Sequence, residues 1–280
     1  MVGERSLTTV DSSRRQSVKA TNKVIMVIAA VSWLASGIAV GQTIEFSYKS
    51  REISLKALPP IPGTGVQLVL DDDQSEGDFG VNTPNAQQFM WFNQFTPPTV
   101  GVRLDQVWVL FPPGAAANVS VGDQVEILVY LDPDGDPGSG ATLLRSISET
   151  VQVADGNTFS VYTLSPPIDV VDSGDILIGV VDRWVESGVT GPTRPAAIDV
   201  TTSQARSWLA VWSGDPPQPP ALPADSVFSL VDAFQPGNWM IRAFGEPLSL
   251  NAIPTVSRVG LAAFLLLLSI SGVLLLRRGL

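Results

Sequence analysis

Short runs of apolar and β-branched residues alternate with polar turn residues along the middle of the chain. Four of these runs are rich in Val, Ile, Leu, Tyr and Trp and are bounded by Gly, Pro, Asp or Ser: residues 124–131, 158–164, 176–181 and 208–212. Such runs are typical of β-strands, and no window has the periodicity of an amphipathic helix. The pattern therefore predicts a body made of strands, roughly ten of them.

This succession of strands favours an all-β fold, an antiparallel β-sandwich of jelly-roll type, over residues 66–246. Residues 42–65 precede the sandwich and are expected to form one strand, over residues 42–48, and then a stiff linker. The linker is inferred from the clustered prolines of residues 58–63, because proline cannot donate to a strand ladder.

One turn within the sandwich stands out. Asp155-Gly156 lies between residues 150–153 and the strand that begins near residue 158. A two-residue turn of this kind needs positive backbone angles, which Gly adopts at little cost. The pair therefore predicts a hairpin that joins the two flanking strands.

The N-terminal segment has the pattern of a secretory signal. Residues 1–23 carry five basic and two acidic side chains, and residues 24–40 contain no charge. Ala39 and Gly41 are small residues suited to cleavage before Gln42, so residues 1–41 are predicted to be a signal peptide. The alternative is an uncleaved N-terminal membrane anchor, and with either the rest of the chain is exported.

The C-terminal segment has the pattern of a membrane anchor. Residues 259–276 carry no charge and no polar stripe, and Arg277 and Arg278 follow directly. A run that is apolar on every face indicates a transmembrane helix, and the positive-inside rule places the two arginines in the cytoplasm. We therefore expect a stalk over residues 247–258 and a membrane-anchoring helix within residues 259–280, with the sandwich outside the membrane.

A short motif comes just before this apolar run. Its residues are Ile253, Pro254, Thr255, Ser257 and Gly260. Together with the leucine-rich helix and the terminal arginines, the motif resembles the IPTL-CTERM sorting signal of exported proteins in Gram-negative bacteria. The resemblance covers residues 253–280 and implies a periplasmic or cell-surface location, membrane retention and processing by a sorting protease or transpeptidase. It implies nothing about the activity of the sandwich.

The composition excludes most familiar catalytic machinery. The chain contains no Cys and no His, so thiolate nucleophiles, Ser-His-Asp triads and thiolate metal sites are excluded. A Ser-Lys pair is disfavoured as well, because all four lysines come before residue 57. Only carboxylate chemistry remains, for which Glu126 and Glu149 are the candidates. The prediction is a protein that is not an enzyme, with a carboxylate-based glycosidase as the less favoured alternative.

The net charge of the sandwich limits which molecules it could bind. Residues 66–246 hold 23 acidic side chains and six arginines, a net charge of −17. Such a surface repels phosphate backbones, so nucleic acid is excluded as a partner. Divalent cations and neutral molecules fit this charge better.

Two acidic segments are candidate Ca²⁺ sites. The first presents Asp132, Asp134 and Asp136 at alternate positions of a loop that contains glycine, and Ca²⁺ takes six to eight oxygen ligands in relaxed geometry. The loop lacks the spacing of an EF-hand, and the alternative is a solvated acidic turn. The second segment offers Asp72, Asp73 and Glu76, of which at most two could meet one ion on an extended chain without a sharp turn. Here too the alternative is a solvated acidic loop.

Tryptophans are candidates for stacking on sugar rings. Trp184 with Asp182 and Arg183 is the preferred ligand-binding edge, because these residues end a strand where loops begin. The alternative is that the tryptophans of the sandwich fill its core. The leading hypothesis is thus an exported, membrane-anchored module that binds glycan or matrix material and is stabilised by Ca²⁺. A purely structural protein of the surface or extracellular matrix is the alternative.

Overall fold

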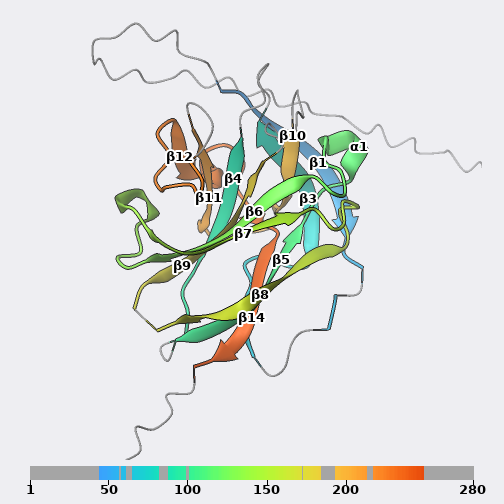
Figure 1. Ribbon diagram of the computed structural model, residues 1–280. Helices are drawn as coiled ribbons and strands as arrows, with labels where there is room; N and C mark the ends of the chain where they lie inside the picture. Colours follow the sequence, from blue (N-terminus) through green and yellow to red (C-terminus); the bar gives the residue numbers. More distant parts are fainter. Residues whose placement is uncertain are drawn as a thin grey trace, which may run out of the picture.

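A computed structural model describes the central part of the chain (Figure 1). The described residues are 44–56, 58–60, 65–81, 88–98, 101–171, 173–183, 193–212 and 217–248. The predicted signal peptide, the IPT motif, the predicted anchor and Trp184 lie outside these ranges. Within them, no helix is long and apolar enough to cross a bilayer.

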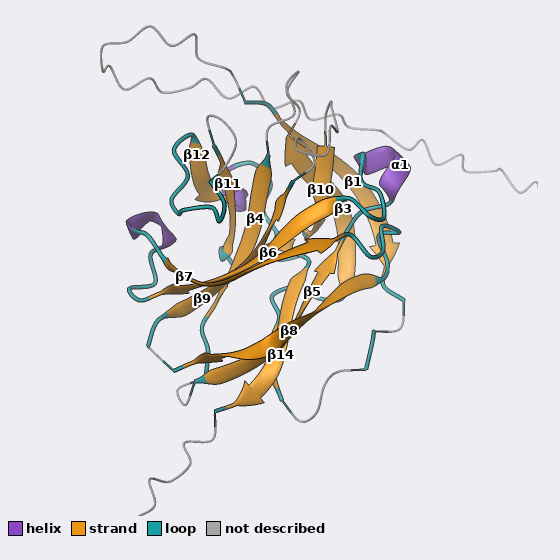
Figure 2. Ribbon diagram, viewed as in Figure 1, coloured by secondary structure: helices purple, strands orange, loops and turns teal. Residues whose placement is uncertain are grey.

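The described chain is nearly all antiparallel β-sheet, and its few helical turns are short (Figure 2). The largest sheet has six strands, in the order β12 (Val227–Leu230), β11 (Ser207–Val211), β4 (Phe89–Phe95), β9 (Asp175–Asp182), β6 (Gln124–Asp132) and β7 (Thr142–Thr150). The helical turns are α1 (Gly114–Ala117), η1 (Pro137–Ser139) and η2 (Val231–Ala233).

Two four-stranded sheets form the opposite layer. One has the order β1 (Phe46–Ser54), β3 (Gln74–Val81), β10 (Thr193–Asp199) and β13 (Asn238–Trp239); the other has the order β2 (Val66–Leu68), β14 (Ile241–Pro247), β5 (Val102–Leu110) and β8 (Phe159–Val170). Met240 joins them, because its N–H donates to Ala197 at 3.0 Å and its carbonyl accepts from Leu110 at 3.0 Å. The two sheets therefore continue into each other.

The main core lies between the layers. It contains side chains from all three sheets, including Phe89 and Trp91 of β4, Val107 of β5 and Trp239 of β13. Phe89 stacks on Trp91 with ring centroids 5.4 Å apart, and Trp91, Trp108 and Trp239 are at most 1% exposed. These tryptophans fill the interior, as the core-packing alternative expects.

The outer face of the six-stranded sheet is buried as well. Met90, Phe92, Tyr130 and Leu177 form a second apolar cluster there, together with Leu222 from a proline-rich segment. The hydroxyl of Tyr130 donates to the carbonyl of Pro220 at 2.7 Å. Residues 217–224 cover this outer face, so the central strands of the sheet are buried on both faces. Burial on both faces explains why these strands are continuous hydrophobic runs in the sequence.

The predicted all-β sandwich is confirmed, with two local corrections. The N-terminal strand begins at Phe46 and reaches Ser54, so it lies later than predicted. Gly156 has the expected positive φ of 76°, but β7 pairs with β6 and β8 pairs with β5, so the predicted hairpin is wrong. Asp155 and Gly156 set the local reversal, and the chain then crosses from one layer to the other.

Candidate functional site

A polar pocket lies where β6, β7 and the end of β9 meet, on the six-stranded sheet. Its volume is about 280 Å³. The lining residues from β6 and β7 are Gln124, Val125, Glu126, Ser146, Ser148 and Glu149, and Arg183 joins them from just beyond the end of β9. Gln218 and Pro219, from the segment that covers the apolar outer face, complete the wall.

An ion pair between Glu126 and Arg183 forms part of this pocket. Arg183 Nε donates to Glu126 Oε2 at 3.0 Å, and the two side chains are only 4% and 8% exposed. Ser146 donates its hydroxyl to the other oxygen of Glu126. Arg183 also donates to the side chain of Gln88 at 3.3 Å. The charges are therefore held in place by Ser146 of β7 and by Gln88, which directly precedes β4.

The register of the strands explains why these two residues meet. β6 and β9 are paired antiparallel neighbours, and the backbone N–H of Arg183 donates to the carbonyl of Gln124 at 3.0 Å. Side chains of a strand alternate between its faces, so Glu126 lies on the same face as Leu128 and Tyr130 of the outer cluster. An acid inside an apolar strand is thus placed beside the arginine that directly follows the neighbouring strand.

The pocket is lined mainly by hydrogen-bond donors and acceptors, and Val125 and Pro219 form its smaller apolar part. Amide, hydroxyl, carboxylate and guanidinium groups all line it. The guanidinium of Arg183 is balanced by Glu126, and Glu149 adds a second carboxylate. This set fits a neutral ligand rich in hydroxyl groups better than an anion.

Asp182 and Arg183 are consecutive residues, but their side chains point to opposite faces of the sheet. Asp182 faces away from the pocket, and its Oδ1 accepts from the N–H of Phe89 at 3.2 Å. Within the described part of the chain, nothing donates to its Oδ2. Burial raises the pKa of Asp182 to about 8. Of the predicted sugar-binding residues, Arg183 lines the pocket and Asp182 lies in the interior.

The first acidic loop combines one buried and two exposed carboxylates. Asp132, the last residue of β6, is 0% exposed, whereas Asp134 and Asp136 are exposed. Asp134 accepts from the N–H of Asp136 at 3.1 Å and from the hydroxyl of Ser139 at 2.7 Å. Burial and the neighbouring carboxylate of Asp134 raise the pKa of Asp132 to about 6.

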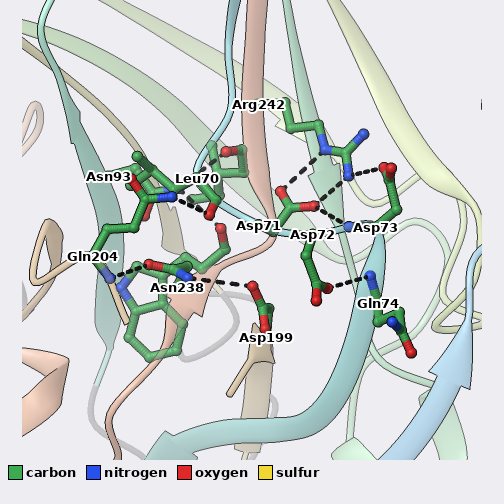
Figure 3. A network of polar contacts seen from close by, with 12 residues as sticks. Leu70, Asp71, Asp72, Asp73, Gln74, Asn93, Asp199, Gln204, Asn238 and Arg242 are labelled. Carbon is green, nitrogen blue, oxygen red and sulfur yellow. Dashed lines mark hydrogen bonds and ion pairs between the residues drawn. The ribbon is translucent and has the colours of Figure 1, made fainter. Parts of the chain in front are cut away.

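The aspartates of the second acidic segment contact two different residues, Arg242 and Gln74 (Figure 3). Asp71 and Asp73 turn towards Arg242 and form ion pairs with it, whereas Asp72 turns the other way, to the N–H of Gln74. Asp73, one of the predicted ligands, is therefore engaged by an arginine. The chain bends at Asp71 and Asp73, and Asp73 has a positive φ of 72°, so the three side chains do not point in one direction.

Asp72 lies in a cluster with Glu76 and Asp199. One carboxylate oxygen of each lies within 4.8 Å of the others, a spacing at which the three could hold a cation. Burial, Asp199 and Asp72 raise the pKa of Glu76. Sequence reasoning missed Asp199, because only the pairing of β3 with β10 brings it beside Glu76. Asp132 instead has Asp134 and Asp175 as charged neighbours, so the two acidic clusters are separate.

No family model and no curated protein matches the chain. Among solved structures, the chain is similar to the crystal structure of the cysteine protease and lectin-like domains of Cwp84, a surface layer associated protein of Clostridium difficile. The TM-score is 0.43 and the sequence identity is 14%, and the match covers 65% of this chain and 36% of that one. The clostridial cysteine protease Cwp84 after propeptide cleavage is similar at a TM-score of 0.39 and 15% identity, over 58% and 36%. The matched part is thus about a third of those chains.

Proposed function

We propose that this protein is a non-enzymatic β-sandwich module, of jelly-roll type, that is exported and held at a membrane and binds a neutral carbohydrate. The polar pocket around Glu126 and Arg183 is the observation that carries the proposal. Sugar hydroxyls act as both donors and acceptors, and the pocket supplies partners of both kinds. The charge of −17 over residues 66–246 disfavours anionic polymers.

The arrangement of Glu126 supports binding rather than catalysis. A glycosidase acid must carry a proton and present it to the glycosidic oxygen. Both oxygens of Glu126 already accept hydrogen bonds, one from Arg183 and the other from Ser146. This carboxylate therefore acts as an acceptor that orients its neighbours.

A glycan array probed with the full-length chain in detergent tests the proposal. Ser148 is an exposed residue that lines the pocket, so Ser148→Leu should fill it and abolish binding. Thr142→Leu is the matched control, since Thr142 is exposed on the same strand and does not line the pocket. Trp184→Ala should also weaken binding if the ring stacks on the sugar. Absence of binding to every glycan, or equal binding by Ser148→Leu, would refute the proposal.

A glycosidase is the second candidate, because Glu126 and Glu149 line the same pocket. It predicts turnover of a polysaccharide that is lost in Glu149→Gln, measured by the release of reducing ends. Binding without turnover would favour the first proposal. Turnover that is abolished by Glu149→Gln would favour the second.

Location and anchoring rest on the two ends of the sequence. We propose that the N-terminal segment directs export, that residues 259–280 hold the protein in a membrane, and that a sorting protease or transpeptidase recognises the IPT motif. Full-length protein should then sediment with membranes and require detergent for release, whereas a chain that ends at Leu248 should be released freely. Mass spectrometry of the C-terminus would detect cleavage. A chain that is found in the soluble fraction before any cleavage would contradict anchoring.

A further inference from the structure

The end of the β6–β9 ladder brings two aspartates together. Asp132 and Asp175 are directly opposite each other in the antiparallel register. Side chains in such positions share a face and lie close together, and like charges there are destabilising. The two carboxylates have very different surroundings.

Asp175 is fully engaged by donors. It accepts from the hydroxyl of Thr96 at 2.7 Å, from the side-chain amide of Gln94 at 2.7 Å and from the guanidinium of Arg206 at 2.6 Å. The positive charge in this neighbourhood is thus directed at Asp175. It leaves Asp132 without an equivalent partner.

Asp132 is enclosed but unsatisfied. It is 0% exposed, and no described residue donates a hydrogen bond of normal geometry to either of its carboxylate oxygens, although the backbone N–H of Gly135, in the same loop, interacts weakly with it. Buried polar groups in folded proteins almost always have a partner, and an unpaired buried charge is costly. Its acidic neighbours, Asp134 and Asp175, increase that cost. Among the described residues, the nearby guanidinium of Arg206 is therefore paired with Asp175, and no cationic side chain forms an ion pair with Asp132.

We propose that the loop of residues 132–138 binds one Ca²⁺ ion, with the buried carboxylate of Asp132 as its inner ligand and Asp134 as its second. The loop supplies oxygen donors, and the absence of Cys and His from the chain disfavours the softer transition metals. Ca²⁺ fits a flexible loop with carboxylates and backbone carbonyls better than Mg²⁺, which requires a stricter octahedron. The site lies at the far end of β6 from the polar pocket, so this proposal is independent of sugar binding.

Calcium titration of the full-length chain in detergent tests the site, by calorimetry and by thermal unfolding with and without chelator. A ligand that binds only the folded state must raise the unfolding midpoint, so Ca²⁺ should raise it by several degrees. Asp132→Asn should abolish both the heat and the shift. Without Ca²⁺, this variant should melt above the wild type, because its amide can donate to Asp134 and carries no charge.

Two further variants locate the ion. Asp134→Asn, at an exposed position that folding tolerates, should weaken Ca²⁺ affinity at least about tenfold. Glu52→Gln, an exposed change on β1, should leave the response unchanged. No Ca²⁺ response in the wild type would overturn the proposal. A response that survives Asp132→Asn and is lost in Asp72→Asn would also overturn it, since the ion would then occupy the cluster of Asp72, Glu76 and Asp199.

Discussion

Glu126 and Arg183 pair across neighbouring strands of the six-stranded sheet, with Arg183 Nε 3.0 Å from Glu126 Oε2 and both side chains less than 10% exposed. An ion pair this deep is unusual, since each charge loses its hydration. Additional hydrogen bonds from Ser146 to the acid and from the arginine to Gln88 compensate for part of that loss. The pair has two consequences: it gives the pocket its polar character, and it makes stability depend on both partners.

Removing one charge of this pair should destabilise the fold. Glu126→Gln leaves the guanidinium of Arg183 buried without its counter-charge, and we expect the free energy of unfolding to fall by about 3–5 kcal/mol. Urea denaturation of the wild type and the variant measures the difference.

The pair of Arg103 and Asp169 is the matched control. Its Nε–Oδ1 distance is 2.6 Å, but the side chains are 49% and 47% exposed. Asp169→Asn should therefore leave the urea midpoint almost unchanged, because solvent screens exposed pairs. If the two variants cost the same, burial does not account for the effect of Glu126.

The carboxyl of Asp182 should make stability depend on pH. Its pKa is raised to about 8 by burial, from about 3.9 in an unfolded chain. The folded state therefore binds more protons than the unfolded state between these values, so stability is greatest at low pH and falls as pH rises towards 8.

Asp182→Asn isolates this contribution. The amide oxygen can still accept from Phe89, and the side chain no longer ionises. Urea midpoints at pH 6, 7, 8 and 9 should show the wild type losing stability relative to the variant up to about pH 8, and a constant difference above it. A difference that does not change with pH would show that Asp182 is ionised throughout.

The strands were predictable because their hydrophobic runs are local. Residues 124–131 contain Val, Ile, Leu and Tyr on both faces, and the structure buries both faces of β6. The partners of each strand were not predictable in the same way. The turn at Asp155-Gly156 is visible in the sequence, but which sheet the chain joins next depends on contacts with β5, which comes earlier in the chain.

The same limit applies to the sites. Glu126 was recognisable as an acid within an apolar strand, but its pairing with Arg183 comes from the alignment of β6 with β9. Asp199 is more than 120 residues from Asp72 and Glu76, and no sequence motif connects them. Asp182 and Arg183 are consecutive, but their side chains point to opposite faces of the sheet. In the sequence, the position of these residues at the end of a strand hid this alternation.

Asn93 should be essential for joining the two layers. From β4, its side-chain amide donates to the carbonyls of Trp239 at 2.9 Å and Ile241 at 3.0 Å, in the opposite layer. Asn93→Leu would leave both carbonyls buried and unpaired, so we expect a loss of about 2–4 kcal/mol in the free energy of unfolding. Gln106, on β5, offers a contrast: its side chain accepts from Trp108 within one strand, and Gln106→Leu should cost much less. Equal costs in urea denaturation would contradict a linking role for Asn93.

Gly179 should tolerate no side chain, because β4 lies directly against it. A Cβ at this position would lie 2.4 Å from the Cβ of Phe92 and 2.8 Å from the carbonyl oxygen of Trp91. Both contacts are with rigid parts of the neighbouring strand, so Gly179→Ala should cost about 3 kcal/mol or more through overpacking. Gly122 is the control position for backbone strain without crowding, because it has a φ of 96° and open space around its Cβ position.

Gly122→Ala should therefore cost about 1 kcal/mol, and Gly122→Asn less, because Asn tolerates positive φ better. At Gly179 the larger Asn should instead be worse than Ala, since space is what limits the position. Thermal and urea denaturation of the four variants would check both orders. If Asn were also the milder change at Gly179, the constraint there would be conformational, and the close packing of β9 on β4 would not explain it.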